Sequence, residues 1–149
     1  AAVDRIRDGL GFTATVNSAM QVDTATVEAL RRQPGNLLID ARGAERFAGH
    51  NETIDPVAGH VPGARNHPFL ENLGADGKFL GPEELRRRWS VVLGALPSSA
   101  AIAMCGSGVT ACHNLLALEH AGLPGARLYA GSWSEWIRDP ARPIATGAH

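Results

Sequence analysis

Short apolar runs alternate with longer amphipathic segments along most of this chain. The apolar runs are three to five residues long and lack polar alternation, which is typical of strands that are buried on both faces. The strands predicted in this way span residues 37–39, 100–104 and 127–129, with a shorter one near 64–66. A different pattern, in which apolar and polar residues alternate, predicts an edge strand at 12–16.

The segments between these strands carry apolar residues at helical spacing. They are predicted to form helices at 24–32, 82–94, 111–121 and 133–138. Asp23 is suited to cap the first helix, Pro82 fits the first position of the second, and Gly122 is expected to close the third. Strands in alternation with helices predict an α/β fold, in which a mostly parallel central sheet is flanked by helices on both faces. In such sheets ligands bind beyond the carboxyl ends of the strands.

The length and composition restrict the class of protein. A chain of 149 residues is ordinarily one domain, and we assign 1–20 to an N-terminal linker or edge-strand segment and 21–149 to a single domain. The chain is 44% apolar and 19% charged, with a net charge of −1. It has no basic stripe, so no nucleic-acid partner is expected. Its apolar runs are far shorter than the roughly 20 residues of a membrane helix, so no membrane contact is expected either.

Two cysteines are too few for a disulfide framework. His113 and His120 lie on one predicted helix, but no cysteine or carboxylate pattern completes them as a zinc site. The sequence therefore predicts no metal and no cofactor, and a reducing, cytoplasmic setting fits it best.

The strongest candidate for chemistry directly follows the apolar run at 100–104. Cys105 opens a loop, 105–110, that contains two glycines and leads into the predicted helix. Such a loop surrounds the sulfur with backbone N–H groups and places it at a helix N-terminus. Both features favour negative charge, so we expect Cys105 to be a nucleophilic thiolate near neutral pH.

Other conspicuous residues are interpreted as structural. Cys112 lies one to two turns into the predicted helix, near Leu115 and Leu116, and is expected to be buried in the core. The run 86–88 of three arginines is interpreted as a solvated helix face. The remaining side chains expected to serve packing, hydrogen bonding or the surface are Asp40, Arg42, His50, His60, His67, His113, His120, Trp133 and Trp136.

Three segments together resemble the rhodanese family of sulfurtransferases, and the resemblance covers nearly the whole chain. The segments 38–47 and 59–66 resemble the family's first signature, and 129–136 resembles its second. Between them, Cys-Gly-Ser-Gly-Val-Thr-Ala at 105–111 is similar to the loop of mercaptopyruvate sulfurtransferases. The overall pattern looks most like the C-terminal, catalytic half of a tandem two-domain enzyme.

The resemblance implies a rhodanese-like fold and a sulfur transfer in two steps. Cys105 would take the outer sulfur of a small anionic donor, and a thiol or cyanide acceptor, such as a thioredoxin-like protein, would remove it. Arg46 would bind the anionic end of the donor, and Ser107 would assist proton transfer as a second catalytic residue. The loop residues implied to bind the donor are Gly106, Ser107, Gly108, Val109 and Thr110. An N-terminal rhodanese domain of the same protein would be a further partner.

The residues leave the donor open. Mercaptopyruvate enzymes commonly carry a second arginine about nine residues after the first, and here that position holds Asp55, as in thiosulfate-type relatives. The loop therefore favours mercaptopyruvate, whereas the position of Asp55 favours thiosulfate.

Two other functions compete with sulfur transfer. A cysteine phosphatase needs a loop one residue longer that ends in arginine, and Ala111 stands where that arginine would be. A non-catalytic rhodanese-like module that binds a partner or senses redox state remains the alternative, and it predicts ordinary thiol reactivity for Cys105.

Overall fold

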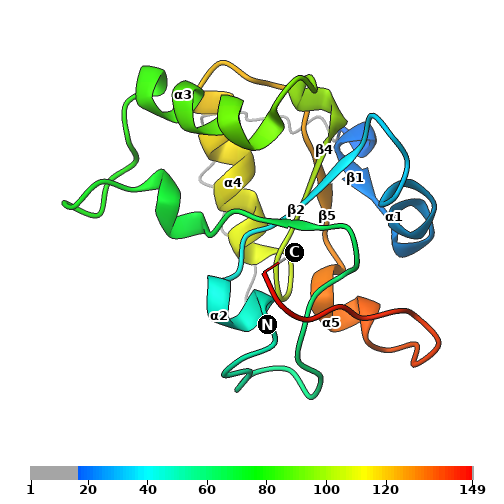
Figure 1. The fold of residues 1–149 in the computed structure, drawn as a ribbon. Helices are drawn as coiled ribbons and strands as arrows, with labels where there is room; N and C mark the ends of the chain where they lie inside the picture. Colours follow the sequence, from blue (N-terminus) through cyan, green and yellow to red (C-terminus); the bar gives the residue numbers. More distant parts are fainter. Residues whose placement is uncertain (1–16, 149) are drawn as a thin grey trace, which may run out of the picture.

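The computed structural model describes residues 17–148, and a five-stranded sheet forms its centre (Figure 1). The strands are β1 (Gln21–Val22), β2 (Leu37–Asp40), β3 (Arg65–Asn66), β4 (Ala101–Met104) and β5 (Arg127–Tyr129). Their order across the sheet is β1-β5-β4-β2-β3, and every neighbouring pair is parallel. The predicted α/β fold is confirmed. The strand predicted at 12–16 lies outside the described residues.

The two central strands explain why their sequences have no polar alternation. All residues of β2 and β4 are buried, and the strands pair in register from Leu37 with Ala101 to Asp40 with Met104. Successive side chains of β2 enter different clusters: Leu38 packs on one face of the sheet, whereas Leu37 and Ile39 pack on the other. Both faces are therefore covered by apolar side chains, as expected for a parallel sheet.

Helices form a layer on each face of the sheet (Figure 1). On one face lie α3 (Pro82–Leu93) and α4 (Val109–His120), which contribute Trp89 and Leu118 to the core. On the other lie α1 (Thr24–Leu30) and α5 (Ser132–Trp136), with Trp133 and Trp136 fully buried. The short helix α2 (Ala44–Phe47) follows β2, and three 3-10 helices span Ser18–Met20, Phe69–Asn72 and Ser98–Ala100.

The ends of the helices agree with most of the local signals. The Asp23 carboxylate caps α1 by accepting a hydrogen bond of 2.8 Å from the amide of Thr26. Pro82 occupies the first turn of α3, and the helix ends before Gly94, whose φ is 62°. Helix α1 ends at Leu30, two residues earlier than predicted, and α5 spans Ser132–Trp136 instead of 133–138. Within the described part of the chain, no helix is long and apolar enough to cross a membrane.

Helix α2 was not predicted from the sequence, and α4 begins at Val109 and not at 111. Gly108 precedes it in the left-handed conformation, with φ of 82°, and a Cβ atom there would lie 2.6 Å from the carbonyl oxygen of Ala130. Only glycine can make this turn without strain or collision. The loop that begins at Cys105 is therefore shorter than predicted, because Val109 and Thr110 already belong to the first turn of the helix.

Candidate active site

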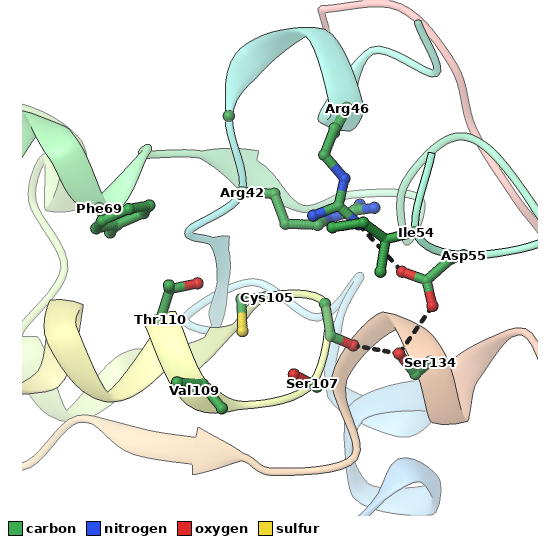
Figure 2. Close-up of a pocket in the computed structure, with 12 residues that line it drawn as sticks. Arg42, Arg46, Ile54, Asp55, Phe69, Cys105, Ser107, Val109, Thr110 and Ser134 are labelled. Atoms are coloured by element: carbon green, nitrogen blue, oxygen red, sulfur yellow. Dashed lines mark hydrogen bonds and ion pairs between the residues drawn. The ribbon is translucent and has the colours of Figure 1, made fainter. Parts of the chain in front are cut away.

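Three chain segments meet at the carboxyl edge of the sheet. Cys105 follows β4, Arg42 and helix α2 follow β2, and α5 follows β5. Because β4 lies between β2 and β5, these segments surround Cys105 from both sides. Cys105 itself is buried, with 2% of its surface exposed. In Figure 2 its sulfur lies inside the curve formed by the loop and the start of α4.

Helix α5 fixes the orientation of the loop. The amides of Trp133 and Ser134 donate hydrogen bonds to the carbonyls of Cys105 (3.0 Å) and Gly106 (2.9 Å), and the Ser134 hydroxyl also donates to the Gly106 carbonyl (2.8 Å). No peptide bond in the described residues is cis, so the N–H of each peptide group points away from its own carbonyl. The amides of Gly106 and Ser107 are therefore directed away from α5.

The loop amides are available to stabilise an anion. Within residues 17–148, no acceptor receives a hydrogen bond from the amides of 106–111. These amides include the unpaired N–H groups at the start of α4, where the helix dipole also favours negative charge. This environment favours negative charge on a group bound in front of the loop.

A cavity of about 210 Å³ opens in front of Cys105. Its wall combines loop residues, charged side chains from the segment after β2, and apolar side chains at the mouth. The lining residues are Arg42, Gly43, Arg46, Ile54, Asp55, Phe69, Cys105, Gly106, Ser107, Val109, Thr110 and Ser134. The cavity is smaller than the roughly 300–1,000 Å³ of sites for drug-sized ligands, so it is suited to a small substrate.

Arg46 lies on this wall and is held by two carboxylates. Its Nε atom donates to both oxygens of Glu52 (3.1 Å each), and its Nη2 atom lies 2.9 Å from Glu52 and 3.1 Å from Asp55. The same Ser134 hydroxyl lies 2.9 Å from the other oxygen of Asp55, so its single proton is shared between this oxygen and the Gly106 carbonyl. This chain of contacts joins α2 to α5 across the cavity (Figure 2).

Glu52 binds the Arg46 guanidinium and holds it in place. Burial by itself raises the pKa of the Glu52 carboxyl, but hydrogen bonds from Arg46 and from the amides of Asp55 and Ile54 outweigh it. The resulting pKa lies below the ordinary value, so Glu52 is ionised at neutral pH.

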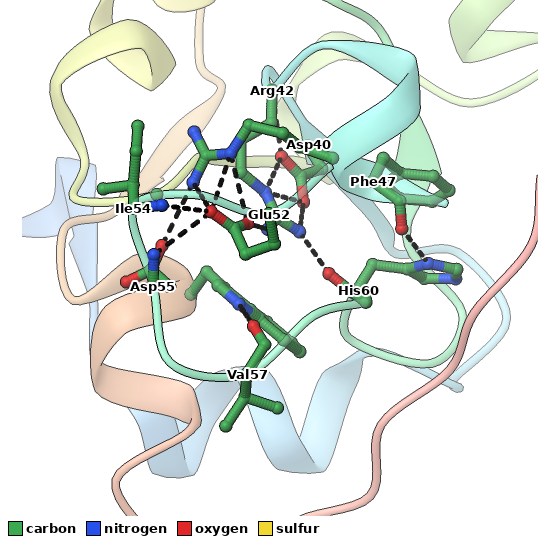
Figure 3. Close-up of polar contacts among 12 residues, drawn as sticks. Asp40, Arg42, Phe47, Glu52, Ile54, Asp55, Val57 and His60 are labelled. Carbon is green, nitrogen blue, oxygen red and sulfur yellow. Dashed lines mark hydrogen bonds and ion pairs between the residues drawn. The ribbon is translucent and has the colours of Figure 1, made fainter. Parts of the chain in front are cut away.

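Arg42, which also lines the cavity, belongs to a buried ion pair that is shown in Figure 3. The Arg42 guanidinium binds both oxygens of Asp40, the closest contact being 2.8 Å, and it also donates to the carbonyl of Gly59 at 2.8 Å. Its Nη1 atom lies 3.6 Å from Glu52, and its guanidinium lies 4.9 Å from the ring centre of Trp133. Asp40 and Arg42 thus fix the end of β2, as predicted. Through its contact with Glu52, Arg42 also adjoins the group formed by Arg46, Glu52 and Asp55.

The predicted site residues are brought together, with one difference. Cys105, Arg46 and the loop residues Gly106, Ser107, Val109 and Thr110 line the cavity, and Ser107 is exposed. Gly108 does not line it, because its position is determined by the turn against Ala130. Which of these residues react or bind substrate remains a prediction.

Sequence reasoning did not single out two polar side chains of the site, Glu52 and Ser134. It also did not single out the lining residues Gly43, Ile54 and Phe69. Ser134 has a usable signal, because it follows β5 at the same edge of the sheet as Cys105. Glu52 lies in an irregular segment and has no comparable signal. Asp55 was noted only for its spacing from Arg46, and its contact with Ser134, 79 residues away, was not foreseen.

The prediction that Cys112 is buried in the core is wrong. Cys112 is exposed, and its Sγ atom donates a weak hydrogen bond to the carbonyl of Gly108 at 3.4 Å. The face of α4 that packs on the sheet consists of Ala111, Asn114, Ala117 and Leu118, and Cys112 is turned about 100° away from Ala111 on the helix.

The prediction that histidines and tryptophans serve packing or hydrogen bonding is confirmed for His60, His67, Trp133 and Trp136, which are all buried. The Nδ1 atom of His60 lies 2.8 Å from the carbonyl of Phe47, and His67 is buried against Trp89. Among residues 17–148, no group of three or more His, Cys, Asp or Glu side chains is placed to hold a metal ion.

Comparisons with known proteins agree with this geometry. The chain is 56% identical over 136 residues to a Pseudomonas aeruginosa protein named "Probable 3-mercaptopyruvate sulfurtransferase". The matched region covers 91% of this chain and 48% of that protein. The chain is 39% identical over 131 residues to the thiosulfate sulfurtransferase of Mus musculus, covering 85% of this chain and 43% of that one. The chain therefore spans about half the length of these relatives, or slightly less.

The fold has close counterparts among solved structures. The Tum1 protein of Saccharomyces cerevisiae superposes with a TM-score of 0.74 at 28% identity, over 86% of this chain and 47% of that one. Residues 23–139 match the family described as the Rhodanese-like domain. With the parallel sheet, the cysteine loop at its carboxyl edge and these matches in agreement, the chain belongs to the rhodanese family.

Proposed function

We propose that this domain is a sulfurtransferase that carries a sulfane sulfur as a persulfide on Cys105. The observation that supports this most strongly is the position of the sulfur, which lies inside a loop of unpaired amides at the end of a small cavity. A thiolate and a terminal persulfide sulfur are both anionic, so the same amides stabilise the enzyme before and after it accepts sulfur.

In the first step the Cys105 thiolate attacks the outer sulfur of the donor. The new bond joins Sγ to that sulfur, and the bond between the donor's outer sulfur and the rest of the donor breaks, with its electron pair leaving on the donor. For thiosulfate the leaving group is sulfite; for mercaptopyruvate it is the enolate of pyruvate, which takes up a proton. Arg46 binds the anionic end of the donor, and the Ser107 hydroxyl is placed to assist this proton transfer.

In the second step an acceptor thiolate attacks the outer sulfur of the persulfide. The acceptor–sulfur bond forms, the bond to Sγ breaks, and Cys105 is regenerated as a thiolate. No external oxidant or reductant is needed, since the electron pair moves between sulfur atoms. Relatives named for mercaptopyruvate and for thiosulfate both match this chain, so both donors belong in the test.

An intact-mass measurement tests the proposal directly. After incubation with either donor and removal of excess reagent, we expect the protein to gain about 32 Da, the mass of one sulfur atom bound to the nucleophile. Cys105→Ser should show no gain. Cys112→Ser is the matched control, because its thiol is exposed outside the cavity, and it should retain the gain.

Lack of any mass gain in the wild type, under conditions in which Cys105 is alkylated, would contradict sulfur transfer. That result would favour the alternative of a non-catalytic rhodanese-like module that binds a partner or senses redox state. Relative to the wild type, Ser107→Ala is expected to slow the gain of sulfur from mercaptopyruvate more than the gain from thiosulfate. The reason is that only the leaving group of mercaptopyruvate needs a proton.

The mouth of the cavity supports the proposal of protein partners. Ile54 and Val109 both line the cavity, and their side chains are 74% and 72% exposed there. We propose that a second rhodanese domain of the same protein, or a thioredoxin-like acceptor, covers them. If so, attaching the adjoining domain should lower the KM for the donor, and Val109→Ser should abolish that difference.

We also propose the cytoplasm or another reducing compartment as the site of action. Cys105 and Cys112 are both free in the described structure, and persulfide chemistry needs Cys105 unoxidised. Fractionation of cells with an antibody to the protein would test this placement.

A further inference from the structure

The wall of the cavity carries a carboxylate, Asp55, as well as the arginine that is proposed to bind the donor. Two arginines and three carboxylates form one connected group, so it carries a single formal negative charge when all are ionised; its members are Asp40, Arg42, Arg46, Glu52 and Asp55. Asp40 and Glu52 are buried and occupied by arginine contacts. Asp55, by contrast, lines the cavity, so its charge faces whatever binds there.

Arg46 and Asp55 present opposite charges at one place on the cavity wall. Their contact is 3.1 Å, and a Cβ atom on Gly106 would lie 3.7 Å from Arg46 Nη2 and 3.8 Å from Asp55 Oδ2. Both groups therefore lie beside Gly106, the residue that follows the nucleophile. They are positioned to contact a molecule whose sulfur has reached Cys105.

Each of the two groups keeps hydrogen-bonding capacity. Arg46 Nη1 has no partner among the described residues, whereas its Nε and Nη2 atoms are occupied by Glu52 and Asp55. Each Asp55 oxygen accepts one hydrogen bond, from Arg46 or from Ser134, and an ionised carboxylate can accept about four in all. A carboxylate can thus bind Arg46 Nη1 while an ammonium group binds Asp55.

We propose that Asp55 selects, as sulfur acceptors, small thiols that carry an ammonium group, with a 2-amino-3-thiol acid such as cysteine as the best match. In such a molecule the ammonium and the carboxylate are bonded to the same carbon, so neighbouring opposite charges on the wall bind both. The thiol is one carbon further on and can reach the persulfide. This inference rests on the proposed persulfide function and specifies the acceptor for its second step.

The chemistry of the step is balanced. The acceptor thiolate bonds to the outer sulfur of the Cys105 persulfide, the bond between that sulfur and Sγ breaks, and the electron pair stays on Sγ. The acceptor leaves as a persulfide, with the ammonium and carboxylate groups unchanged. Asp55 takes no part in bond breaking and acts only through binding.

The test compares two acceptors that differ in one group. The protein is first loaded with sulfur from thiosulfate, the gain of about 32 Da is verified, and the donor is removed. Loss of the added mass is then timed with cysteine and with N-acetylcysteine, which keeps the carboxylate and thiol but has no ammonium group. Rates are expressed per thiolate, and the ratio of the two rates is divided by the ratio that the same two thiols give with a small-molecule persulfide. The different acidity and nucleophilicity of the two thiols then do not enter the comparison.

We expect the wild type to react faster with cysteine, by about tenfold, which is the size of one hydrogen bond to a charged group. Asp55→Asn should abolish this preference, and Asp55→Glu, which keeps the charge, should retain part of it. The matched control is Glu45→Gln, which removes a carboxylate that does not line the cavity and contacts only Asn51, and it should keep the full preference.

Equal rates for the two acceptors in the wild type would overturn the inference without any variant, which matters if Asp55→Asn fails to fold. An unchanged preference in a folded Asp55→Asn protein would overturn it as well. Absence of the initial mass gain is a separate result, because it would overturn the proposed function itself and this inference with it.

Discussion

The amide of Cys105 donates a hydrogen bond of 3.0 Å to the hydroxyl of Ser132, which in turn donates to the carbonyl of Tyr129 at 2.9 Å. Ser132 is fully buried and has a φ of 53°, a left-handed conformation that is rare for serine. One side chain therefore links the residue that carries the nucleophile to the end of β5. A strained backbone conformation persists only where the surrounding contacts hold it, and such residues cluster at functional sites. We therefore interpret Ser132 as a positioning residue for Cys105.

Replacement of Ser132 by alanine should leave the buried amide of Cys105 without a partner. We expect the free energy of unfolding to fall by about 1–3 kcal/mol, the cost of an unsatisfied buried group, and sulfur loading to slow. Urea unfolding and the timed mass gain measure the two effects. Ser90→Ala is the control, since that hydroxyl donates to the carbonyl of Arg86 on the exposed face of α3, and it should cost less than about 0.5 kcal/mol. A Ser132→Ala protein as stable as the wild type would contradict this role.

The central sheet could be predicted from sequence because its signal is local. In β2 and β4, continuous apolar runs report burial on both faces, and the structure confirms both strands. The orientation of Cys112 could not be predicted in the same way. Apolar residues occur all around α4, and Leu116 is 58% exposed, so hydrophobic spacing does not reveal which face is buried.

The site could be predicted only where it lies within one continuous segment. Cys105 and its loop follow directly from a strand, two glycines and a helix in succession. The contact of Ser134 with Asp55 depends instead on the order of strands in the sheet, because β5 must lie beside β4 to bring α5 next to the loop. No spacing along the chain encodes that order, so the far wall of the cavity became visible only in the structure.

Two glycines of the loop should respond differently to alanine. In Gly108→Ala the new Cβ would lie 2.6 Å from the Ala130 carbonyl oxygen, at a φ of 82°. We therefore expect the free energy of unfolding to fall by about 1–3 kcal/mol and sulfur loading to be lost. In Gly106→Ala the nearest atom is Arg46 Nη2 at 3.7 Å and φ is not left-handed, so stability should hold while the methyl group narrows the cavity and slows loading. Thermal unfolding and mass gain separate the two cases. Equal stability of the two variants would refute the argument.

The buried pair of Asp40 and Arg42 should be sensitive to loss of one partner. Both side chains are at most 1% exposed, so Asp40→Asn would leave the Arg42 charge with only the more distant Glu52 to compensate it. We expect the variant to lose about 3–5 kcal/mol of unfolding free energy. The control Asp76→Asn removes an exposed carboxylate that lies 3.9 Å from Lys78, and it should change stability by less than about 0.5 kcal/mol. A loss below about 1 kcal/mol in Asp40→Asn would show that the pair does not lock β2.

Stability should fall as the solution is acidified, and His67 is a named contributor. Burial against Trp89 lowers the pKa of His67, and this effect outweighs the opposing hydrogen bond with Asn72. The unfolded chain, in which histidine titrates near its ordinary value of 6.5, therefore binds a proton more readily than the native state. By linkage, the stability that neutral His67 provides is complete above the unfolded pKa and is lost as the pH falls below it towards the native pKa.

Urea unfolding at pH 7 and pH 5 measures this contribution, because the ordinary pKa values of carboxyl groups, about 4, lie below that range. Burial also lowers the pKa values of His60 and His113, so the wild type should lose stability over this interval through all three histidines. His67→Gln should show a smaller loss, since glutamine keeps a hydrogen-bonding group but cannot take up the proton. His120→Gln, at an exposed position on α4, should retain the wild-type loss. If His67→Gln and the wild type lose the same free energy between pH 7 and pH 5, the coupling between burial of His67 and acid sensitivity is refuted.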